Sequence, residues 1–588
     1  MYRKRKCSKK HGKKCHCKKC CCRPLYYKYY VSCRERFFRD KSIKIRSALG
    51  SIQYEFKPKC PKYTQQDIRY QAYNYNGSFH KTLQHDTTTG ALTAQDQYRQ
   101  LACSFYNNDL QSLYNVKLAV GSEILLVNPS ASFCSILMGA PQNVFDVPTP
   151  PTLDSAAAAS EMVEVYSQAV ARDVAFINYD LDGTIATLLK DTYLNDPDVL
   201  ANLPDAPAGP FTPQTVFRAD FEGCTIGPYI SQLLLLDIQF SNAVMEQRYF
   251  TYLPRYNQRV EWGVTPAEMI DIENGIYTGT TPPAVDPVAK YIFNGRALAE
   301  AVHNDAIFQY YYQAALLMSA AEVDPNPTVP SYLNQEAFVT DNGLPNVICA
   351  VAGAAKLALT HAWYWKWVKF RRLRPEVYSL WVHNVKSKTV ANEGNYDLND
   401  IILDNDVLNN IKKINKDWLV PTPNECYTLP LCFQEGSPAH GSYPAGHATV
   451  AGACATVLKM FFDGNQKWND VPLVITGALS GGVPGAVQAN DTGLTRVAYT
   501  GEDESEMTVG GEINKLATNV ALGRDWAGVH YRTDGTKGIL LGEKVAMRYM
   551  GDLLSAAAEN YTNNEPPAIT FRNFEGELVT VCPTVCSC

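Results

Sequence analysis

The stretch Ser437-Pro-Ala-His-Gly-Ser-Tyr-Pro-Ala-Gly-His-Ala-Thr-Val450 organises the rest of this chain. It holds His440 and His447 seven residues apart, and good helix formers follow over 448–460. Gly446 leaves a bare backbone amide at the positive end of this expected helix, where anions bind. A histidine fixed beside that amide can exchange protons with the bound group. We therefore expect an anion site where this helix begins.

The segments around this stretch predict a mainly α protein, with long helices in a helix-bundle architecture and Pro-rich connecting loops. Apolar residues recur every three or four positions in several segments, whereas regular β alternation is scarce. A buried helix, rather than a strand, is expected over 227–237 because of its length. Tyrosine-rich 54–91 is expected to form a surface arm, and polar 385–406 a surface excursion. The other predicted helices are 94–108, 155–177, 291–321, 344–370 and 514–529.

Composition narrows the class of protein. The 588 residues are 46% hydrophobic and 19% charged, as in an ordinary globular protein, and are enough to bury a sizeable core. The formal net charge of -5 gives no general case for nucleic-acid binding. No uninterrupted apolar run reaches the length of a membrane span, and the N-terminus lacks the apolar core of a secretory signal. The compartment is left open.

We expect four parts along the chain. A basic, Cys-rich tail occupies 1–48, a helical part with a surface arm 49–340, a helical part carrying the anion site 341–565, and a Cys-tipped tail 566–588. The N-terminal tail fits a metal-binding arm, a disulfide anchor between subunits or a contact for an anionic partner. It fits a disordered solubilising extension equally well.

Two further segments supply cationic side chains. Trp363-Tyr-Trp-Lys366-Trp-Val-Lys-Phe-Arg-Arg-Leu-Arg374-Pro375 closes an apolar helix, and the proline pushes Arg374 out of helical conformation. Ala521-Leu-Gly-Arg524-Asp-Trp-Ala-Gly-Val-His530-Tyr-Arg-Thr-Asp534 adds an arginine, a histidine and a carboxylate that can orient the imidazole. Taken alone, the first segment also fits a solvated basic helix end. The three segments together favour a shared site.

An oxyanion fits this set of side chains better than a metal cation. Lysine and arginine repel a cation, and no Asp, Glu or Cys cluster accompanies the histidines. Arginine forks, a lysine charge and a helix amide suit a tetrahedral or trigonal oxyanion. One histidine can then attack or coordinate the central atom while another protonates the opposite oxygen. Phosphate and vanadate are the candidates.

The order of these residues resembles that of a known family. It runs Lys366-x7-Arg374-Pro375, then Tyr-Pro-Ala-Gly-His447, then Gly-Arg524-x5-His530-x3-Asp534. This order resembles the vanadium-dependent haloperoxidases, which share their site plan with type 2 phosphatidic acid phosphatases and bacterial class A acid phosphatases. The flanking Ser437-Pro-Ala-His440 is similar to the algal and cyanobacterial bromoperoxidase branch. The resemblance covers about residues 54–560 and leaves out both Cys-rich ends.

The resemblance implies a vanadate cofactor and a role for each site residue. His530 would bond vanadium, and Lys366, Arg374 and Arg524 would neutralise the vanadate oxygens. The Gly446 amide would donate a hydrogen bond to one of these oxygens. His447 would act as acid and base toward hydrogen peroxide, and Lys366 would polarise the bound peroxide for halide attack. His440 corresponds to a histidine of the bromoperoxidase branch that lies behind the direct ligands. A structural divalent cation has no assigned ligands.

Two positions bear on the strength and selectivity of the site. Where the family usually has serine, this chain has Ala445, and the missing charge-assisted hydrogen bond is worth roughly 1.5–3 kcal/mol. The resemblance implies arginine at the position of Trp363 in algal bromoperoxidases and tryptophan in fungal chloroperoxidases. His440 points to bromide and Trp363 to chloride, so the halide preference is open, with bromide and iodide favoured.

The resemblance implies an enzyme that oxidises halide with hydrogen peroxide to hypohalous acid, assembled as a homo-oligomer and without a membrane span. The organic halogen acceptor is unknown. An acid phosphatase is the first alternative, with His530 as nucleophile and His447 as leaving-group acid. A structural relative that has lost catalytic strength is the second, and Ala445 and the Cys-rich ends support it.

Overall fold

The computed structural model describes residues 64–583 except 71–76, 108, 134–138, 252–259, 278–284, 330–333, 419–424 and 557–566. Before residue 64 it describes only Asp40, Lys41, Lys44 and Ala48. The chain divides into two compact units, residues 1–52 and 53–588, and every element below belongs to the second. Nearly all of the predicted basic tail over 1–48 therefore lies outside the described residues, as do Cys586 and Cys588 of the C-terminal end.

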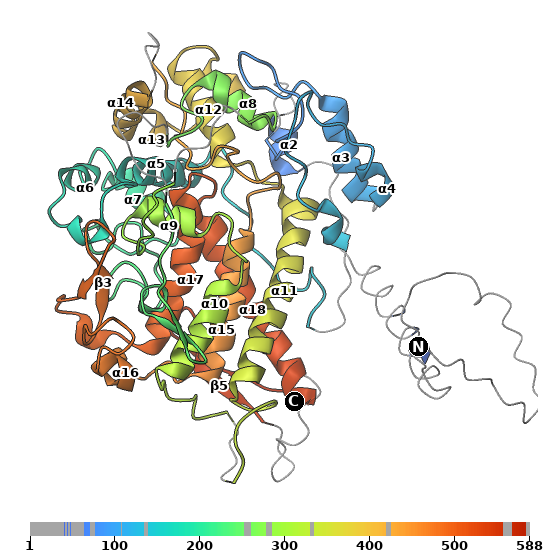
Figure 1. Cartoon of the computed structure of the whole chain (residues 1–588). Helices are drawn as coiled ribbons and strands as arrows, with labels where there is room; N and C mark the ends of the chain where they lie inside the picture. The colour runs from blue at the N-terminus through green and yellow to red at the C-terminus, as the bar shows by residue number, and fades with distance from the viewer. Residues whose placement is uncertain are drawn as a thin grey trace, which may run out of the picture. The chain divides into compact units, whose positions relative to one another are not determined.

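Four long helices form the centre of the second unit and run beside one another (Figure 1). Two glycines let α15 and α18 approach closely: a Cβ on Gly452 would clash with the Ile539 carbonyl oxygen, and one on Gly542 with that of Thr449. The apolar faces of these helices make up much of the buried core. The four helices are α11 (Leu344–Tyr364), α15 (Gly446–Phe461), α17 (Val509–Trp526) and α18 (Arg532–Ala556).

Shorter helices surround this centre and confirm the prediction of a mainly α fold. The α-helices are α2 (Gln65–Tyr70), α3 (Gln95–Asn107), α4 (Leu110–Leu113), α5 (Ala156–Ala171), α6 (Gly183–Leu188), α7 (Pro197–Asn202), α8 (Pro266–Glu273), α9 (Gly295–Ala301), α10 (Gln309–Ala320), α12 (Pro375–Lys386), α13 (Asp400–Leu403), α14 (Val407–Trp418) and α16 (Pro472–Ile475). Short 3₁₀ turns occupy Pro129–Phe133, Phe176–Asn178, Gln232–Leu234, Trp468–Asp470 and Glu504–Glu506.

The strands in the described part of the chain form three antiparallel ribbons. In the first, β1 (Ile238–Phe240) pairs with β2 (Ala243–Met245), and Ile238 faces Met245. In the second, β3 (Val487–Ala489) pairs with β4 (Arg496–Ala498). The third joins β5 (Ile569–Arg572) to β6 (Leu578–Val581) inside the predicted C-terminal tail, where Phe571 and Phe574 are buried.

The prediction of a helix over 227–237 is wrong. The segment contains a 3₁₀ turn over 232–234 and then leads into β1. Side chains satisfy its backbone instead of a helical ladder: the Gln247 amide donates to the Leu233 and Leu236 carbonyls, at 2.9 and 2.8 Å. An apolar run buried on all sides has no period that separates helix from other buried structure.

Four other segments differ from their predictions. The helix predicted over 155–177 ends at Ala171, and the one over 291–321 is split into α9 and α10. The expected surface arm is wrong for its described part, because Phe79, His80 and Leu83 are buried. The region 385–406 contains α13 and an irregular turn over 392–396, where the backbone of Glu393 and Gly394 is not helical and the Tyr396 ring stacks on Trp381. The buried aromatic contact of Tyr396 holds this segment in place, and the polar composition of the segment gives no sign of it.

The apolar helix α11 is the one element of the described chain with the length and composition of a membrane span. Together with its continuation it covers Leu344–Phe370, and 61% of its most apolar window is buried inside the protein. It packs against α10, α15 and α18. The apolar residues of α11 thus pack inside the helical core.

Candidate anion-binding site

The end of α11 carries Lys366 into the protein interior. The helix continues as a π-helical turn over Trp365–Phe370, which ends where Arg371 adopts a left-handed conformation with φ of 45°. Arg374 is extended, with φ of -85° and ψ of 157°, and Pro375 begins α12. This matches the prediction that the proline keeps Arg374 out of a helix. The change of direction leaves Lys366 and Arg374 on the same buried site.

Three buried cations meet backbone carbonyls instead of carboxylates. Lys366 Nζ donates to the carbonyls of Gly441 and Ser442 at 2.8 and 2.7 Å. Arg374 Nη1 donates to the Val529 carbonyl at 2.7 Å, and Arg524 Nη1 donates to the Val302 carbonyl at 2.7 Å.

These cations have no counter-charge in direct contact. Within the described ranges, no ion pair joins Lys366, Arg374 or Arg524 to a carboxylate, and the buried Arg524 Nε has no hydrogen-bond partner. Uncompensated buried charge is costly, so the arrangement is suited to an external anion.

The pKa shifts show how strongly the cations disfavour one another. Burial lowers the pKa of Lys366 well below its ordinary value, and the charges of Arg374 and Arg524 lower it further. Burial also lowers the pKa of Arg374 to about 10 and lowers that of Arg524. An anion bound among the three groups would reverse these shifts, because it favours their charged forms.

Asp534 fixes the orientation of His530, as the spacing of four residues predicts. His530 Nδ1 lies 2.8 Å from Asp534 Oδ2, and His530 Nε2 lies 2.8 Å from Arg374 Nη1. A carboxylate only accepts and a guanidinium only donates, so the proton is on Nδ1 and the Nε2 lone pair faces the cations. Burial lowers the pKa of His530 well below its usual range, which keeps the ring neutral.

Asp534 is itself held as an anion. It accepts from Arg372 Nη1 at 2.7 Å, from the Tyr531 amide at 3.1 Å and from the Ser442 hydroxyl. Although burial opposes ionisation, Arg372 and His530 hold the pKa of Asp534 below its usual value. The Arg372 contact also corrects the alternative of a solvated basic helix end, since Arg371 and Arg372 are buried.

His447 lies at the start of α15 beside Gly446, as predicted. Its Nε2 is 2.7 Å from Asp305 Oδ1, so Nε2 holds the proton and Nδ1 remains for exchange with a bound group. Burial lowers the pKa of His447, and the Asp305 hydrogen bond opposes that shift. The sequence did not predict a role for Asp305, which lies 142 residues before His447 in a segment without periodic apolar residues.

The N-terminus of α15 is bare of a side-chain cap. Ala445 is its N-cap and makes no side-chain cap bond, while its own amide donates to the Asp534 carbonyl at 2.8 Å. A Cβ on Gly446 would lie 3.1 Å from the Trp363 ring. The amides of the first turn thus stay free for an acceptor.

His440 and Trp363 form one wall of the site. Their ring centroids are 5.0 Å apart, and His440 Nδ1 lies 3.0 Å from Arg374 Nη2. The Trp363 indole donates to the Val127 carbonyl at 3.1 Å. Burial and the Lys366 charge lower the pKa of His440 well below its ordinary value. All predicted site residues therefore come from the regions of α11, α12, α15, α17 and α18 that meet here.

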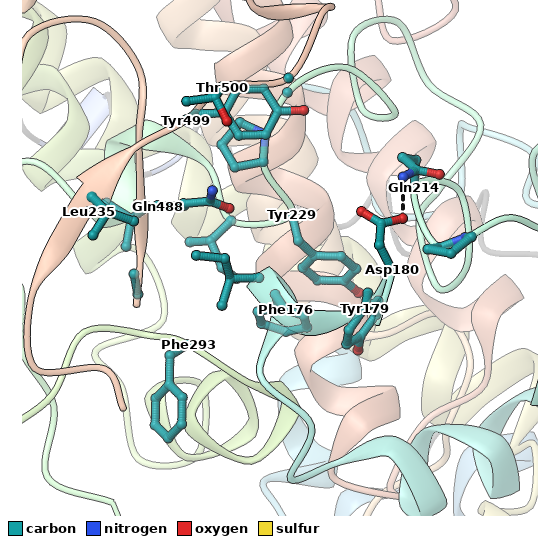
Figure 2. A pocket seen from close by; sticks show the side chains of 18 of the residues that line it. Phe176, Tyr179, Asp180, Gln214, Tyr229, Leu235, Phe293, Gln488, Tyr499 and Thr500 are labelled. Atoms are coloured by element: carbon teal, nitrogen blue, oxygen red, sulfur yellow. Dashed lines mark hydrogen bonds between the residues drawn. The ribbon is translucent and has the colours of Figure 1, made fainter. Parts of the chain in front are cut away.

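A cavity of about 720 Å³ lies elsewhere in the molecule. Tyr229, Tyr179 and Phe176 line one side of it, and the Gln214 amide donates to Asp180 at 2.6 Å, as Figure 2 shows. None of the predicted site residues lines this cavity. This cavity and the cationic site are thus separate features.

Known proteins resemble this chain over most of its length. A family model described as the VCPO second helical-bundle domain matches residues 427–557. A vanadium-dependent bromoperoxidase of Ascophyllum nodosum is 33% identical over 85% of this chain and 86% of its own length. One of Corallina officinalis is 29% identical over 77% of this chain and 79% of its own.

A solved structure gives the same result for the fold. A homohexameric vanadate-dependent bromoperoxidase of Ascophyllum nodosum superposes with a TM-score of 0.77 and 28% identity. The match covers 96% of this chain and 94% of that chain. With the cationic site and these relatives in view, the chain belongs to the vanadium-dependent haloperoxidases, in their bromoperoxidase branch.

Proposed function

We propose that Lys366, Arg374, Arg524, His447 and His530 hold vanadate, with the Gly446 amide as a further donor. The enzyme is a vanadate-dependent haloperoxidase that oxidises halide with hydrogen peroxide to hypohalous acid. When bound, vanadate activates the peroxide for attack by the halide. The observation that carries the site assignment is the set of three buried cations whose described partners are carbonyls and histidines.

The chemistry of the donors fits an oxyanion. Arg374 and Arg524 offer planar N–H forks, and the orphan Arg524 Nε is a donor that an oxyanion would satisfy. Gly446 begins α15, whose positive end favours negative charge. The neutral His530 presents a lone pair that could coordinate an electron-poor centre. Each donor type that vanadate requires is therefore present.

His447 is assigned the proton transfers. Its Nδ1 takes a proton from hydrogen peroxide as the peroxide binds, while Asp305 holds Nε2–H and the ring orientation. Lys366, anchored by two carbonyls, places its positive charge where the departing oxygen gains negative charge. His440 and Trp363 face the halide side, and bromide and iodide are the favoured substrates.

We extend the proposal to the assembly and the chain ends. A homohexameric relative supports a homo-oligomer for this chain. We keep the division into 1–48, 49–340, 341–565 and 566–588, and the match over 427–557 falls inside the third part. The basic tail over 1–48 is proposed to contact an anionic partner.

A vanadate titration of bromide-dependent monochlorodimedone halogenation tests the function. Activity should rise with vanadate to saturation, fall with competing phosphate and be lost in His530→Ala. His361→Gln, which changes a buried histidine outside the site, should remain active. A folded, vanadate-loaded protein without halogenating activity would refute the proposal. Sustained p-nitrophenyl phosphate turnover, blocked by vanadate, would support the acid phosphatase alternative, which the relatives do not favour.

A further inference from the structure

A second cluster of chemically active side chains lies outside the anion site. His80, His85 and Glu273 each offer one ligand atom, and these atoms lie within 4.8 Å of one another. All three residues are at least 97% buried. Figure 1 places α8, which ends at Glu273, next to α12.

The backbone holds the cluster in place. The Thr82 amide donates to the Glu273 carbonyl at 2.7 Å, and the His85 amide donates to Asn274 Oδ1 at 3.0 Å. The loop that carries both histidines is thereby tied to the C-terminal end of α8. A site formed from this loop and helix is rigid before any ligand arrives.

The hydrogen bonds set the tautomer of His85. Asn274 Oδ1 accepts from the His85 amide, so it also accepts from His85 Nδ1, 3.1 Å away. The lone pair of His85 is then on Nε2, which lies 2.8 Å from His80 Nδ1. A metal-binding histidine has this arrangement, with its second ring nitrogen donating to a fixed oxygen. Burial lowers the pKa of His85 to about 4 and that of His80 well below its usual range, so both rings are neutral.

Glu273 lacks a donor. Neither of its buried carboxyl oxygens accepts a hydrogen bond from any described residue, and no ion pair to it is found among those residues. The nearby Lys81 is already paired with Glu376 at 2.9 Å and with the Glu435 carbonyl at 2.8 Å. Burial and the Glu376 charge raise the pKa of Glu273 well above its ordinary value. The raised pKa favours the protonated form of Glu273, and Glu376 is the acceptor for the hydrogen bond of that proton.

We propose that His80, His85 and Glu273 bind a divalent transition-metal ion of the Zn²⁺ class. Two imidazoles and one carboxylate are a common Zn²⁺ ligand set, with a fourth position for water. Coordination displaces one proton to solvent, from the carboxyl group, while the His80 proton moves from Nδ1 to Nε2 and both imidazoles stay neutral. Tetrahedral ligands of Zn²⁺ lie roughly 3.4 Å apart at bond lengths near 2.1 Å. The rings must separate slightly, and the Glu273 side chain must move inward.

The ion would have a structural role near the anion site. Glu376 follows Arg374 and Pro375 in sequence, and its Oε2 accepts from the Ser437 amide at 2.8 Å. Glu376 also accepts from Lys81 at 2.9 Å, so the groups beside Glu273 connect to the start of the stretch that carries His440 and His447.

Zinc binding to the vanadate-free full-length chain tests the proposal. N-ethylmaleimide treatment first blocks reactive thiols, so that cysteines do not compete as ligands. Zn²⁺ retained after desalting is measured by mass spectrometry, and the melting temperature is followed with added Zn²⁺ or chelator. Co²⁺ in place of Zn²⁺ reports tetrahedral nitrogen and oxygen ligands by its visible absorption. Glu273→Gln and His80→Gln are compared with the wild type and with His361→Gln.

The wild type and His361→Gln should retain about one Zn²⁺ per chain and melt at higher temperature with it. Glu273→Gln and His80→Gln should bind at least about tenfold more weakly. Glu273→Gln removes a buried acid, so it should fold at least as well as the metal-free wild type and no longer respond to Zn²⁺. Equal Zn²⁺ binding by Glu273→Gln and the wild type, or no Zn²⁺ binding by the wild type, would overturn the proposal. Halogenating activity does not enter either outcome.

Discussion

Ala445→Ser probes the anion site most directly. Ala445 is fully buried and is the N-cap of α15, and it carries no side-chain acceptor or donor. A serine hydroxyl here can donate to a vanadate oxygen. Hydrogen bonds to charged groups contribute about 1.5–3 kcal/mol. At 1.36 kcal/mol per tenfold, the vanadate Kd should fall roughly 10- to 150-fold.

A second effect of the same hydroxyl must be separated from the first. Serine is a preferred N-cap and stabilises a helix by about 1 kcal/mol when its oxygen accepts an amide of the first turn. This gain raises the melting temperature without vanadate, whereas the anion contact changes Kd. Vanadate Kd is measured by titration of activity and by phosphate competition. Ala451→Ser, at a buried position further along α15, is the matched control.

The outcomes are distinct. A raised melting temperature with unchanged Kd would show that the hydroxyl only caps the helix and would refute the placement of Ala445 beside the anion. Ala445→Asp adds a carboxylate at the same position. This carboxylate should cap the helix and neutralise the cations, so it should abolish vanadate binding while raising the melting temperature measured without vanadate. If Ala445→Asp bound vanadate as tightly as the wild type, Lys366, Arg374 and Arg524 would not share an anion at this helix end.

Three further variants test the assigned roles. Asp305→Asn removes the carboxylate charge that helps to hold the pKa of His447 up, so the acidic limb of the halogenation pH profile should move to lower pH; an unchanged limb would contradict that role. Because the pKa of Lys366 is lowered and a bound anion raises it, phosphate binding should be accompanied by net proton uptake; calorimetry in two buffers measures this uptake, and Lys366→Gln should reduce it. Asp534→Asn strips a partner from buried Arg372 and should cost about 3 kcal/mol or more in urea unfolding. Since the folded pKa of Asp534 lies below its unfolded value, this loss is complete above about pH 4 and shrinks in acid, where a constant difference would be inconsistent.

The mainly α fold predicted from the sequence is confirmed, whereas the roles of the site residues stay predictions. Motif order brought Lys366, Arg374, Arg524 and His530 together, because their chemistry requires one shared anion and their spacing matches a known site plan. Asp305 was missed, since a lone carboxylate in a turn has no periodic or spacing signal that links it to His447. The tautomers of both histidines also needed the structure, because they follow from distances to specific partners.

Errors in the fold arose where burial runs against composition. The segment around His80 is polar and tyrosine-rich, so it was expected on the surface, yet its loop is buried against α8. The apolar run over 227–237 was expected to be helical, although side chains such as Gln247 satisfy its backbone. In both cases the deciding partners are distant in sequence. Local pattern describes which side chains are apolar, but tertiary contacts decide which backbone groups need a helix.

The partners of the buried cations distinguish structural residues from proposed functional ones in this chain. Arg532 is paired with Glu164, Arg372 with Glu161 and Asp534, and Arg172 and Arg296 both with Glu261. Those pairs hold elements together and leave little net charge. Lys366, Arg374 and Arg524 are equally buried but meet carbonyls and histidines, so the interior retains positive charge at one place. Because such charge disfavours folding unless something compensates it, an external anion should stabilise this protein as well as serve its chemistry.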